Sequence, residues 1–184
     1  MKITDYKKAH ITRTQAYIVN ALFKLLKENS LDILTITEIC QEADVARVTF
    51  YRNFESKEDI LKLYIKILTE DYFSGLQKQS TISLKELSYG YFSYWQQNID
   101  LLFLLKQNNL TTLLLEEYSI VEQYLKNLNK LDFSPKTLNK TQSYYRNAYI
   151  FAGLWRLIFL WIDRDCQESI EEMSQIFLKI QSPQ

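Results

Sequence analysis

The sequence predicts an all-α protein, in which a three-helix N-terminal headpiece is joined by a long helix to a C-terminal helical bundle. Glycine and proline are scarce, with three and two copies in 184 residues, so few positions interrupt a helix. Apolar residues make up 47% of the chain, which is enough for a packed core. They also recur at spacings of three and four, as the buried face of a helix requires.

The headpiece begins with a helix expected over residues 11–28, where Ile18, Leu22 and Leu25 recur at helical spacing. Asn29 then ends it. This first helix provides one apolar face for a small core.

The next segment predicts two short helices joined by a tight turn. Thr35 and Glu38 form a capping-box pattern that starts a helix reaching residue 43. Asp44 and Val45 form the turn, and a third helix follows over 46–53. This arrangement is a helix-turn-helix.

A longer helix is expected to connect the headpiece to the body. Ser56 and Asp59 provide a second cap signal, and the helical pattern continues to about Gly75. The expected domains are therefore residues 1–57 and residues 58–184.

The body is expected to contain five further helices. Apolar residues alternate at spacings of three and four between Leu114 and Leu128, and again between Ile170 and Ile180. The expected ranges are 83–98, 100–108, 110–130, 135–163 and 167–181.

The run from Ile36 to Leu61, ITEICQEADVARVTFYRNFESKEDIL, resembles the DNA-binding domain of the tetracycline-repressor (TetR) family. It combines Thr-Phe-Tyr-x-x-Phe with Ser-Lys-Glu-Asp after a first helix of the expected length, and the resemblance covers about residues 10–65. The body carries no comparable motif. The resemblance implies a transcriptional regulator that binds double-stranded operator DNA as a homodimer. In such a protein, residues 1–57 are the helix-turn-helix DNA-binding domain, and residues 58–184 are the helical bundle for ligand binding, regulation and dimerisation.

A recognition helix places its first turn nearest to the base edges of the major groove. Arg47 and Val48 lie there, so we expect Arg47 to pair with a guanine and Val48 to contact a thymine methyl group. The side chains expected to reach phosphates or flanking bases are Thr49, Tyr51, Arg52 and Asn53.

Five further residues are candidates for contacts with DNA phosphates. The resemblance assigns this role to Thr37 and Lys57, which lie near helix N-termini. Lys7, Lys8 and Arg13 precede or open the first helix and either contact the sugar-phosphate edge or belong to a solvated tail.

Two residues depart from the usual pattern of the family. Asp44 replaces a turn glycine; it tolerates a left-handed backbone but adds negative charge near DNA. Ala46 replaces the usual Ser or Thr cap of the recognition helix, which loses about 1 kcal/mol of capping. Both changes are compatible with a weakened or specialised DNA contact.

Four nearby residues have alternative interpretations. Phe50 and Phe54 are expected in the headpiece core rather than on DNA. Tyr51 is either packed or exposed, and the resemblance favours DNA. Cys40 is expected to be a small buried hydrophobe rather than a redox sensor.

In the resembled family, the body often encloses a small-molecule pocket whose occupation shifts the headpieces out of operator register. With Arg146 or Arg156, such a pocket would suit an aromatic or anionic effector. The candidate lining residues are Tyr91, Trp95, Phe103, Tyr118, Tyr149 and Trp155.

The last two helices are the expected dimer interface. Residues 148–162 are apolar almost all around, and 170–180 carry a second apolar stripe. Paired with a symmetry mate, they form a four-helix bundle whose two-fold axis matches a palindromic operator. The alternative is burial within one subunit. At 15 residues including Arg156, the apolar run is shorter than the roughly 20 residues of a membrane span.

The residue inventory offers little for catalysis, a metal or a cofactor, and we expect none of them. His10 is the sole histidine, and the glycines stand singly, without a phosphate loop. Cys40 and Cys166 provide no disulfide framework, and no secretory signal opens the chain, so a reducing cytoplasm is expected.

The charge pattern leaves two functions open. Net charge is zero, and residues 1–66 carry two more basic than acidic side chains, so DNA binding must depend on local basic groups. We expect a repressor released by a small-molecule effector. The alternative is an adaptor or co-activator that keeps the fold, binds DNA weakly and works through protein partners.

Overall fold

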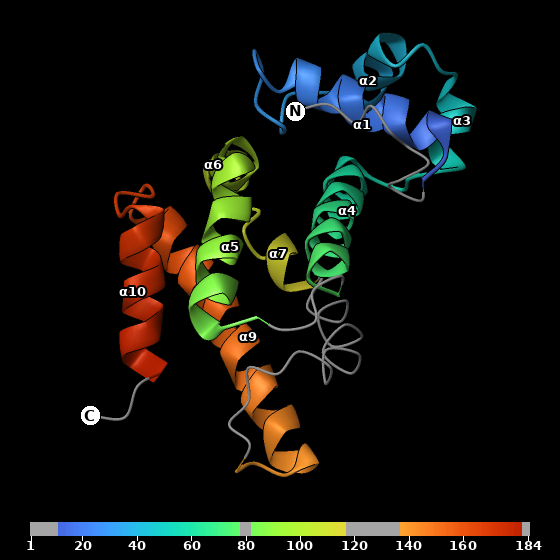
Figure 1. Ribbon diagram of the computed structural model, residues 1–184. Coiled ribbons are helices and arrows are strands. Elements are labelled where there is room, and N and C mark those ends of the chain that lie inside the picture. The colour runs from blue at the N-terminus through green and yellow to red at the C-terminus, as the bar shows by residue number, and fades with distance from the viewer. Residues whose placement is uncertain (1–10, 78–81, 117–136, 182–184) are drawn as a thin grey trace. The chain divides into compact units, whose positions relative to one another are not determined.

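The computed structural model describes residues 11–77, 82–116 and 137–181, which form helices and connecting turns with no strand among them. The predicted all-α class is therefore confirmed (Figure 1). The chain divides into two compact units. The described residues of the first unit are 11–68 and 112–116, and the rest belong to the second unit.

The first unit contains α1 (Arg13–Leu25), α2 (Ile36–Glu42), α3 (Arg47–Tyr51), the first part of α4 (Lys57–Gln77) and α7 (Leu113–Glu116). The division between the units falls inside α4, and the expected domain boundary at residue 57 stays a prediction.

The first helix is shorter than the predicted 11–28. The Thr12 hydroxyl accepts a hydrogen bond from the Gln15 amide, and the Gln15 side chain accepts from the Thr12 amide, so α1 starts after Thr12. Its apolar pattern ends with Leu25, and Leu26 to Asn29 leave the helix through turns.

The core of the first unit joins all of its longer elements. Ile18 from α1, Ile39 from α2, Phe50 from α3 and Ile60 from α4 are fully buried. Phe54 is also buried, and its ring centroid lies 5.9 Å from that of Phe50. The prediction that both phenylalanines belong to the core is confirmed.

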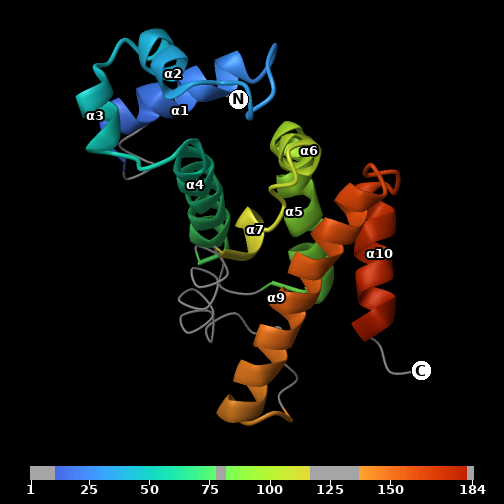
Figure 2. The same ribbon diagram turned by 180° about the vertical axis from the view of Figure 1, so that it is seen from behind.

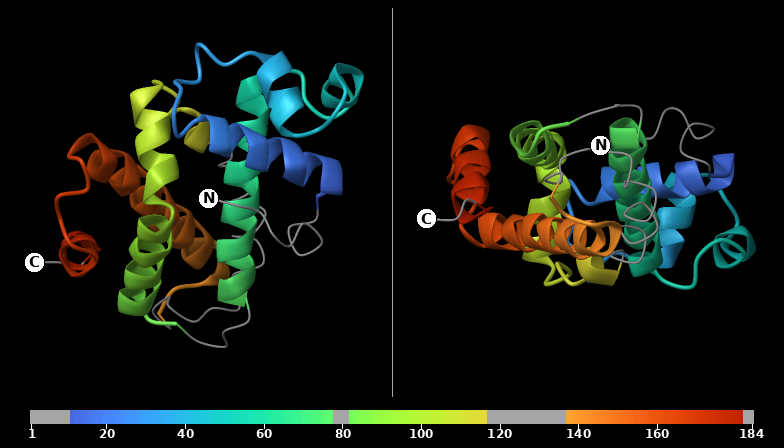
Figure 3. Two further views of the ribbon diagram at one scale, coloured as in Figure 1. Left: turned by 90° about the horizontal axis from the view of Figure 1, so that it is seen from above. Right: turned by 60° about the horizontal axis from the view of Figure 1, so that its bottom comes forward.

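The second unit contains the end of α4 with α5 (Leu84–Gln97), α6 (Ile99–Gln107), α9 (Lys140–Asp163) and α10 (Ile170–Gln181). Helices α5 and α10 lie side by side and antiparallel in opposite views (Figures 1 and 2). Helix α9 crosses α5 obliquely (Figure 3).

Buried contacts hold α10 against α5. The hydroxyls of Ser88 and Ser174 lie 2.7 Å apart and share a hydrogen bond. Met173 and Phe177 of α10 are buried beside them. These two residues of the apolar stripe predicted on this helix are therefore covered within the subunit, whereas Ile180 is exposed.

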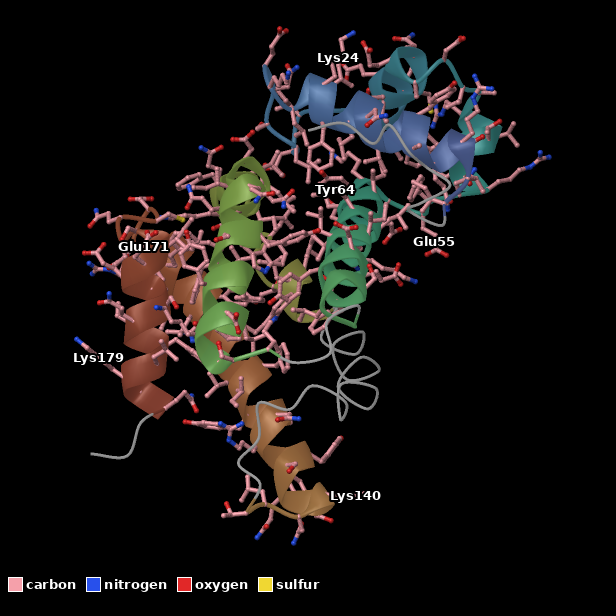
Figure 4. All side chains as sticks on the ribbon, in the orientation of Figure 1. Lys24, Glu55, Tyr64, Lys140, Glu171 and Lys179 are labelled. Carbon is pink, nitrogen blue, oxygen red and sulfur yellow. The ribbon has the colours of Figure 1, made fainter. Side chains whose placement is uncertain are left out.

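Two predicted helices of the body have different bounds. Helix α9 begins at Lys140 (labelled in Figure 4) rather than at 135, because the Asn139 side chain caps it by accepting from the Gln142 amide at 2.9 Å. Within the predicted 110–130 helix, the structure describes α7, and residues 117–130 lie outside the described part.

The end of α9 is fastened by Lys106. Its ammonium donates to the carbonyls of Ile162 and Asp163 at 3.0 and 3.2 Å, and to the Asp165 carboxylate at 2.7 Å. Asp165 and Cys166 then take positive φ values of 57° and 51°. This turn leads the chain from α9 toward α10.

The most apolar helices do not meet the requirements of a membrane span. Among the described residues, no helix is both long enough and apolar enough to cross a bilayer.

Candidate nucleic-acid interface

The helix-turn-helix starts with the predicted capping box. The Thr35 hydroxyl accepts from the Glu38 amide at 3.2 Å, and the Glu38 carboxylate accepts from the Thr35 amide at 2.8 Å. These bonds to Thr35 also lower the pKa of Glu38. Thr37 follows with an exposed side chain in the first turn of α2. The expected start of the second helix is confirmed.

The turn after α2 depends on a left-handed residue. Asp44 has a φ of 53°, a conformation that Asp and Asn tolerate better than most side chains. The Val45 amide then donates to the Cys40 carbonyl at 3.0 Å. The Cys40 side chain is buried, and burial raises its thiol pKa, as expected for a packed hydrophobe.

Helix α3 is anchored by one buried side chain and exposes its other side to solvent. Phe50 is fully buried, whereas Arg47, Val48, Tyr51 and Arg52 are exposed. The exposed fraction of Val48 is 59%. One short helix thus presents two guanidinium groups, a phenol and an aliphatic side chain on a face that its own core anchors.

Arg47 and Tyr51 form a pair on this face. The guanidinium Nη2 lies 3.4 Å from the Tyr51 hydroxyl, and its carbon lies 6.0 Å from the ring centroid. This hydrogen bond raises the pKa of Arg47. The pairing restricts the rotamers of Arg47, so less conformational entropy remains to be lost on binding.

The other two predicted residues of α3 serve its C-terminal end. Thr49 and Asn53 are half-buried, and the Asn53 amide donates to the Thr49 carbonyl at 2.8 Å. This bond satisfies one of the carbonyls left free at a helix end.

Ala46 leaves the start of α3 without a side-chain cap, as predicted. Its backbone has the extended conformation of an N-cap, with φ −71° and ψ 149°. We expect Ala46→Thr to raise the free energy of unfolding by about 1 kcal/mol, because its hydroxyl satisfies a free amide. Urea denaturation measures this change. Ala46→Val is the control, because valine has nearly the shape of threonine but no hydroxyl, and it should not raise the free energy of unfolding. An equal rise in both variants would contradict the capping explanation.

Lys57, which was expected to contact a phosphate, binds backbone carbonyls of its own chain. Its ammonium donates to the carbonyls of Leu31 at 2.7 Å, Leu34 at 2.8 Å and Asp32 at 3.4 Å. These bonds tie the start of α4 to the loop between α1 and α2. Sequence reasoning missed this role. One signal in the sequence pointed to it: a cation in the first turn of a helix opposes the helix dipole, so Lys57 needs other partners there.

A hollow of about 440 Å³ borders the C-terminal end of α3. Its lining includes Gln15 from α1, Arg52 from the α3 end, and the acidic Glu55 and Asp59. The Asp59 carboxylate already accepts the amides of Glu55 and Ser56 at 3.1 and 2.9 Å. The predicted Ser56 cap signal is confirmed, and this carboxylate serves the helix start.

The aromatic residues predicted to bind a ligand separate into different environments. Tyr91, Trp95 and Trp155 are buried in the second unit, and Phe103 is half-buried. Tyr149 is 63% exposed on α9, and Tyr118 lies outside the described residues.

The basic residues predicted to accompany that pocket also differ. Arg146 is half-buried, and burial lowers its pKa, whereas Arg156 is exposed. Arg156 therefore does not accompany the buried rings.

Helix α9 buries one apolar face in its own subunit and exposes a second. Trp155, Ile158 and Ile162 are buried, so one face of this helix packs within the subunit, and the dimer interface stays a prediction. Tyr149 and Leu160 remain exposed on the same helix. We name the exposed positions Tyr145, Tyr149, Ala152, Arg156 and Leu160 the α9 stripe.

In the described part of the chain, no group of three or more His, Cys, Asp or Glu side chains is placed to hold a metal ion.

A helix-turn-helix with an exposed recognition helix, followed by a separate helical unit, defines a DNA-binding transcriptional regulator. A family profile described as bacterial regulatory proteins, tetR family, matches residues 18–64, and one described as a transcriptional regulator C-terminal region matches residues 82–182. The second match covers more than half of the chain. The chain belongs to the TetR family of bacterial regulatory proteins.

A solved structure supports the fold. The fatty acid degradation regulator FadR from Bacillus halodurans matches with a TM-score of 0.58 and 15% identity, over 92% of this chain and 94% of that chain. At this identity the likeness shows the fold alone. A comparison with curated protein sequences gave no match.

Proposed function

We propose that the chain is a sequence-specific repressor that binds palindromic operator DNA as a homodimer and is released by a small-molecule effector. The observation that carries this proposal is the exposed face of α3, where Arg47, Val48 and Tyr51 project from a helix anchored by buried Phe50. Major-groove recognition needs such a rigid, solvent-facing helix.

The residues of this face receive distinct roles. Arg47 reads a guanine through two hydrogen bonds, and Val48 contacts a thymine methyl group. Contact with a methyl group would remove the exposed apolar surface of Val48 from water, which is favourable. Tyr51, Arg52 and Thr37 position the protein on phosphates.

Thr49, Asn53 and Lys57 receive secondary roles. Asn53 and Thr49 close the end of α3 through their 2.8 Å hydrogen bond. Lys57 fixes the α1–α2 loop through three carbonyls. We therefore assign Lys57 to positioning the helix-turn-helix rather than to a direct phosphate contact.

Dimerisation uses the α9 stripe together with the exposed Ile176 and Ile180 of α10. An apolar stripe running along an otherwise packed helix is typical of an association surface. A two-fold pairing of the same helices from two copies makes a four-helix bundle and gives the two recognition helices one symmetry axis.

The test is fluorescence anisotropy of the purified protein on DNA flanking its own gene, against a scrambled duplex, at two salt concentrations. A repressor should bind the flanking DNA more tightly and lose affinity with salt. Equal, weak binding to both duplexes would contradict the proposal and favour the adaptor function, with exposed Asp44 and uncapped α3 as its structural marks.

Arg47→Ala is expected to weaken operator binding by at least about 30-fold, because each of the two half-sites loses a bidentate guanine contact that contributes on the order of 1–3 kcal/mol. Binding to scrambled DNA should change much less. The same anisotropy titration measures both affinities.

Arg52→Ala is the matched control, because it removes an exposed arginine of the same face that we assign to phosphate. It should weaken both duplexes alike and reduce the salt slope. Equal losses on both duplexes from Arg47→Ala would refute base readout by this residue.

A further inference from the structure

Three side-chain atoms of the second unit are buried without a hydrogen-bond partner in the described chain: Thr69 Oγ1, the Tyr91 hydroxyl and Trp155 Nε1. Their residues are 2%, 2% and 5% exposed. A fourth such atom, Glu168 Oε2, belongs to a carboxylate whose other oxygen accepts from Arg164. Native proteins leave few buried polar groups unpaired, because each one costs free energy.

The three unpaired groups come from three helices that surround one aromatic interior. The Tyr91 ring centroid on α5 lies 5.4 Å from that of Tyr72, which is one helical turn from Thr69 on α4. The Trp95 ring contacts both Tyr91, at 6.4 Å, and Trp155 of α9, at 5.8 Å. Ring contacts therefore link the neighbourhoods of all three groups.

The chemistry of these three groups favours a bound molecule that accepts hydrogen bonds. The indole N–H of Trp155 can only donate, whereas the hydroxyls of Tyr91 and Thr69 can donate or accept. Burial raises the pKa of Tyr91 well above its ordinary value and Tyr72 adds to the rise, whereas the Trp95 side chain, a hydrogen-bond donor on the side of the phenolic oxygen, opposes it. The phenol is therefore neutral and keeps its proton available for donation.

The same interior disfavours an anion. The buried polar side chains of the described chain are Thr69, Ser88, Asn147 and Ser174, and none of them ionises. On α9, Arg156 is exposed, and half-buried Arg146 lies nine residues before Trp155, about 14 Å along a helix axis. Among the described residues, a carboxylate at Trp155 would gain no counter-charge in exchange for its lost hydration.

We propose that Thr69, Tyr91 and Trp155 form a binding site for a neutral, planar molecule with a carbonyl-type acceptor, held by the Trp155 indole N–H among the surrounding rings. This inference rests on the proposed function, in which an effector binds the second unit. It replaces the aromatic or anionic effector expected from the sequence by a neutral one.

The test is ¹⁵N NMR of the full-length protein, in which the three tryptophans give three indole N–H signals. Trp161 is an internal reference, because its Nε1 already donates to the Glu168 carbonyl at 3.0 Å. Acetophenone and benzamide are the neutral probes, and benzoate is the anion with the same ring. The Trp155 signal should move and saturate with both neutral probes while that of Trp161 stays, and benzoate should bind at least tenfold more weakly.

Two variants remove one unpaired group each. Trp155→Phe and Tyr91→Phe keep an aromatic ring but lose the polar atom. Each should weaken probe binding at least tenfold. Tyr91→Phe should leave the thermal midpoint of unfolding unchanged, because it removes only the hydroxyl, whereas Trp155→Phe also removes buried ring volume and should lower the midpoint. Tyr89→Phe is the matched control on α5; its exposed hydroxyl donates to Glu171 at 3.2 Å, so probe binding should not change.

Three results would each overturn the site: no movement of the Trp155 signal with either neutral probe, benzoate binding as tight as benzamide, or unchanged binding by Trp155→Phe. Ordered water on the same three atoms predicts the first of these. Operator affinity is measured separately on the same samples. A failure of DNA binding with an intact probe response would count against the proposed function and leave the site established.

Discussion

Leu160→Glu is expected to convert the protein from a dimer into a folded monomer and to weaken operator binding by more than about 100-fold. Leu160 is 41% exposed on the α9 stripe, and Tyr149 is exposed on the same helix. A carboxylate at position 160 would be desolvated within the symmetric interface. Because each half-site then binds alone, the gain from joining two binding events is lost.

Sedimentation velocity measures the oligomeric state, and circular dichroism shows whether the helices persist. Ile33→Glu is the matched control, because Ile33 is an exposed aliphatic residue of the first unit, outside α9 and α10. It should remain a dimer. A Leu160→Glu protein that still sediments as a dimer would show that the subunits associate through another surface.

Local chemistry made the starts of the helices predictable. Thr35 with Glu38, and Ser56 with Asp59, make their hydrogen bonds within four residues, so short sequence patterns contain both partners. The left-handed turn at Asp44 belongs to the same class, because its cost depends on the residue itself. The position of the recognition helix is therefore predictable from the sequence.

Periodicity could not predict which neighbour covers an apolar face. The pattern in 148–162 identifies a buried helix, but Trp155 packs within the subunit while Tyr149 remains exposed. Six positions separate the two residues, so they lie on different faces of the helix, and the apolar run includes both faces. Which face is covered depends on where α5 lies against α9, and this information is spread over distant parts of the chain.

The contacts of Lys57 were also unpredictable, since they join it to residues 23 to 26 positions earlier. The family resemblance suggested a phosphate ligand instead. The structure directs the ammonium to the carbonyls of Leu31, Asp32 and Leu34, which leaves two testable roles for one side chain.

Lys57→Met is expected to lower the free energy of unfolding by about 3 kcal/mol, because hydrogen bonds from a charged donor contribute about 1.5–3 kcal/mol each and two of its carbonyl partners are within 2.8 Å. Urea denaturation measures the loss. Lys62→Met is the control on the same helix; Lys62 lies 3.9 Å from the Asp59 carboxylate at the surface, so its loss should cost less than about 1 kcal/mol.

Salt dependence of DNA binding separates the two roles of Lys57. A positioning lysine leaves the number of phosphate contacts unchanged, so Lys57→Met should keep the slope of log affinity against log salt, measured where the variant is still folded. A lysine that neutralises a phosphate would reduce that slope by about 0.9 per half-site. A reduced slope with little loss of stability would return Lys57 to the phosphate backbone. An unchanged slope with the expected loss would show that the α1–α2 loop needs this ammonium to hold the helix-turn-helix in place.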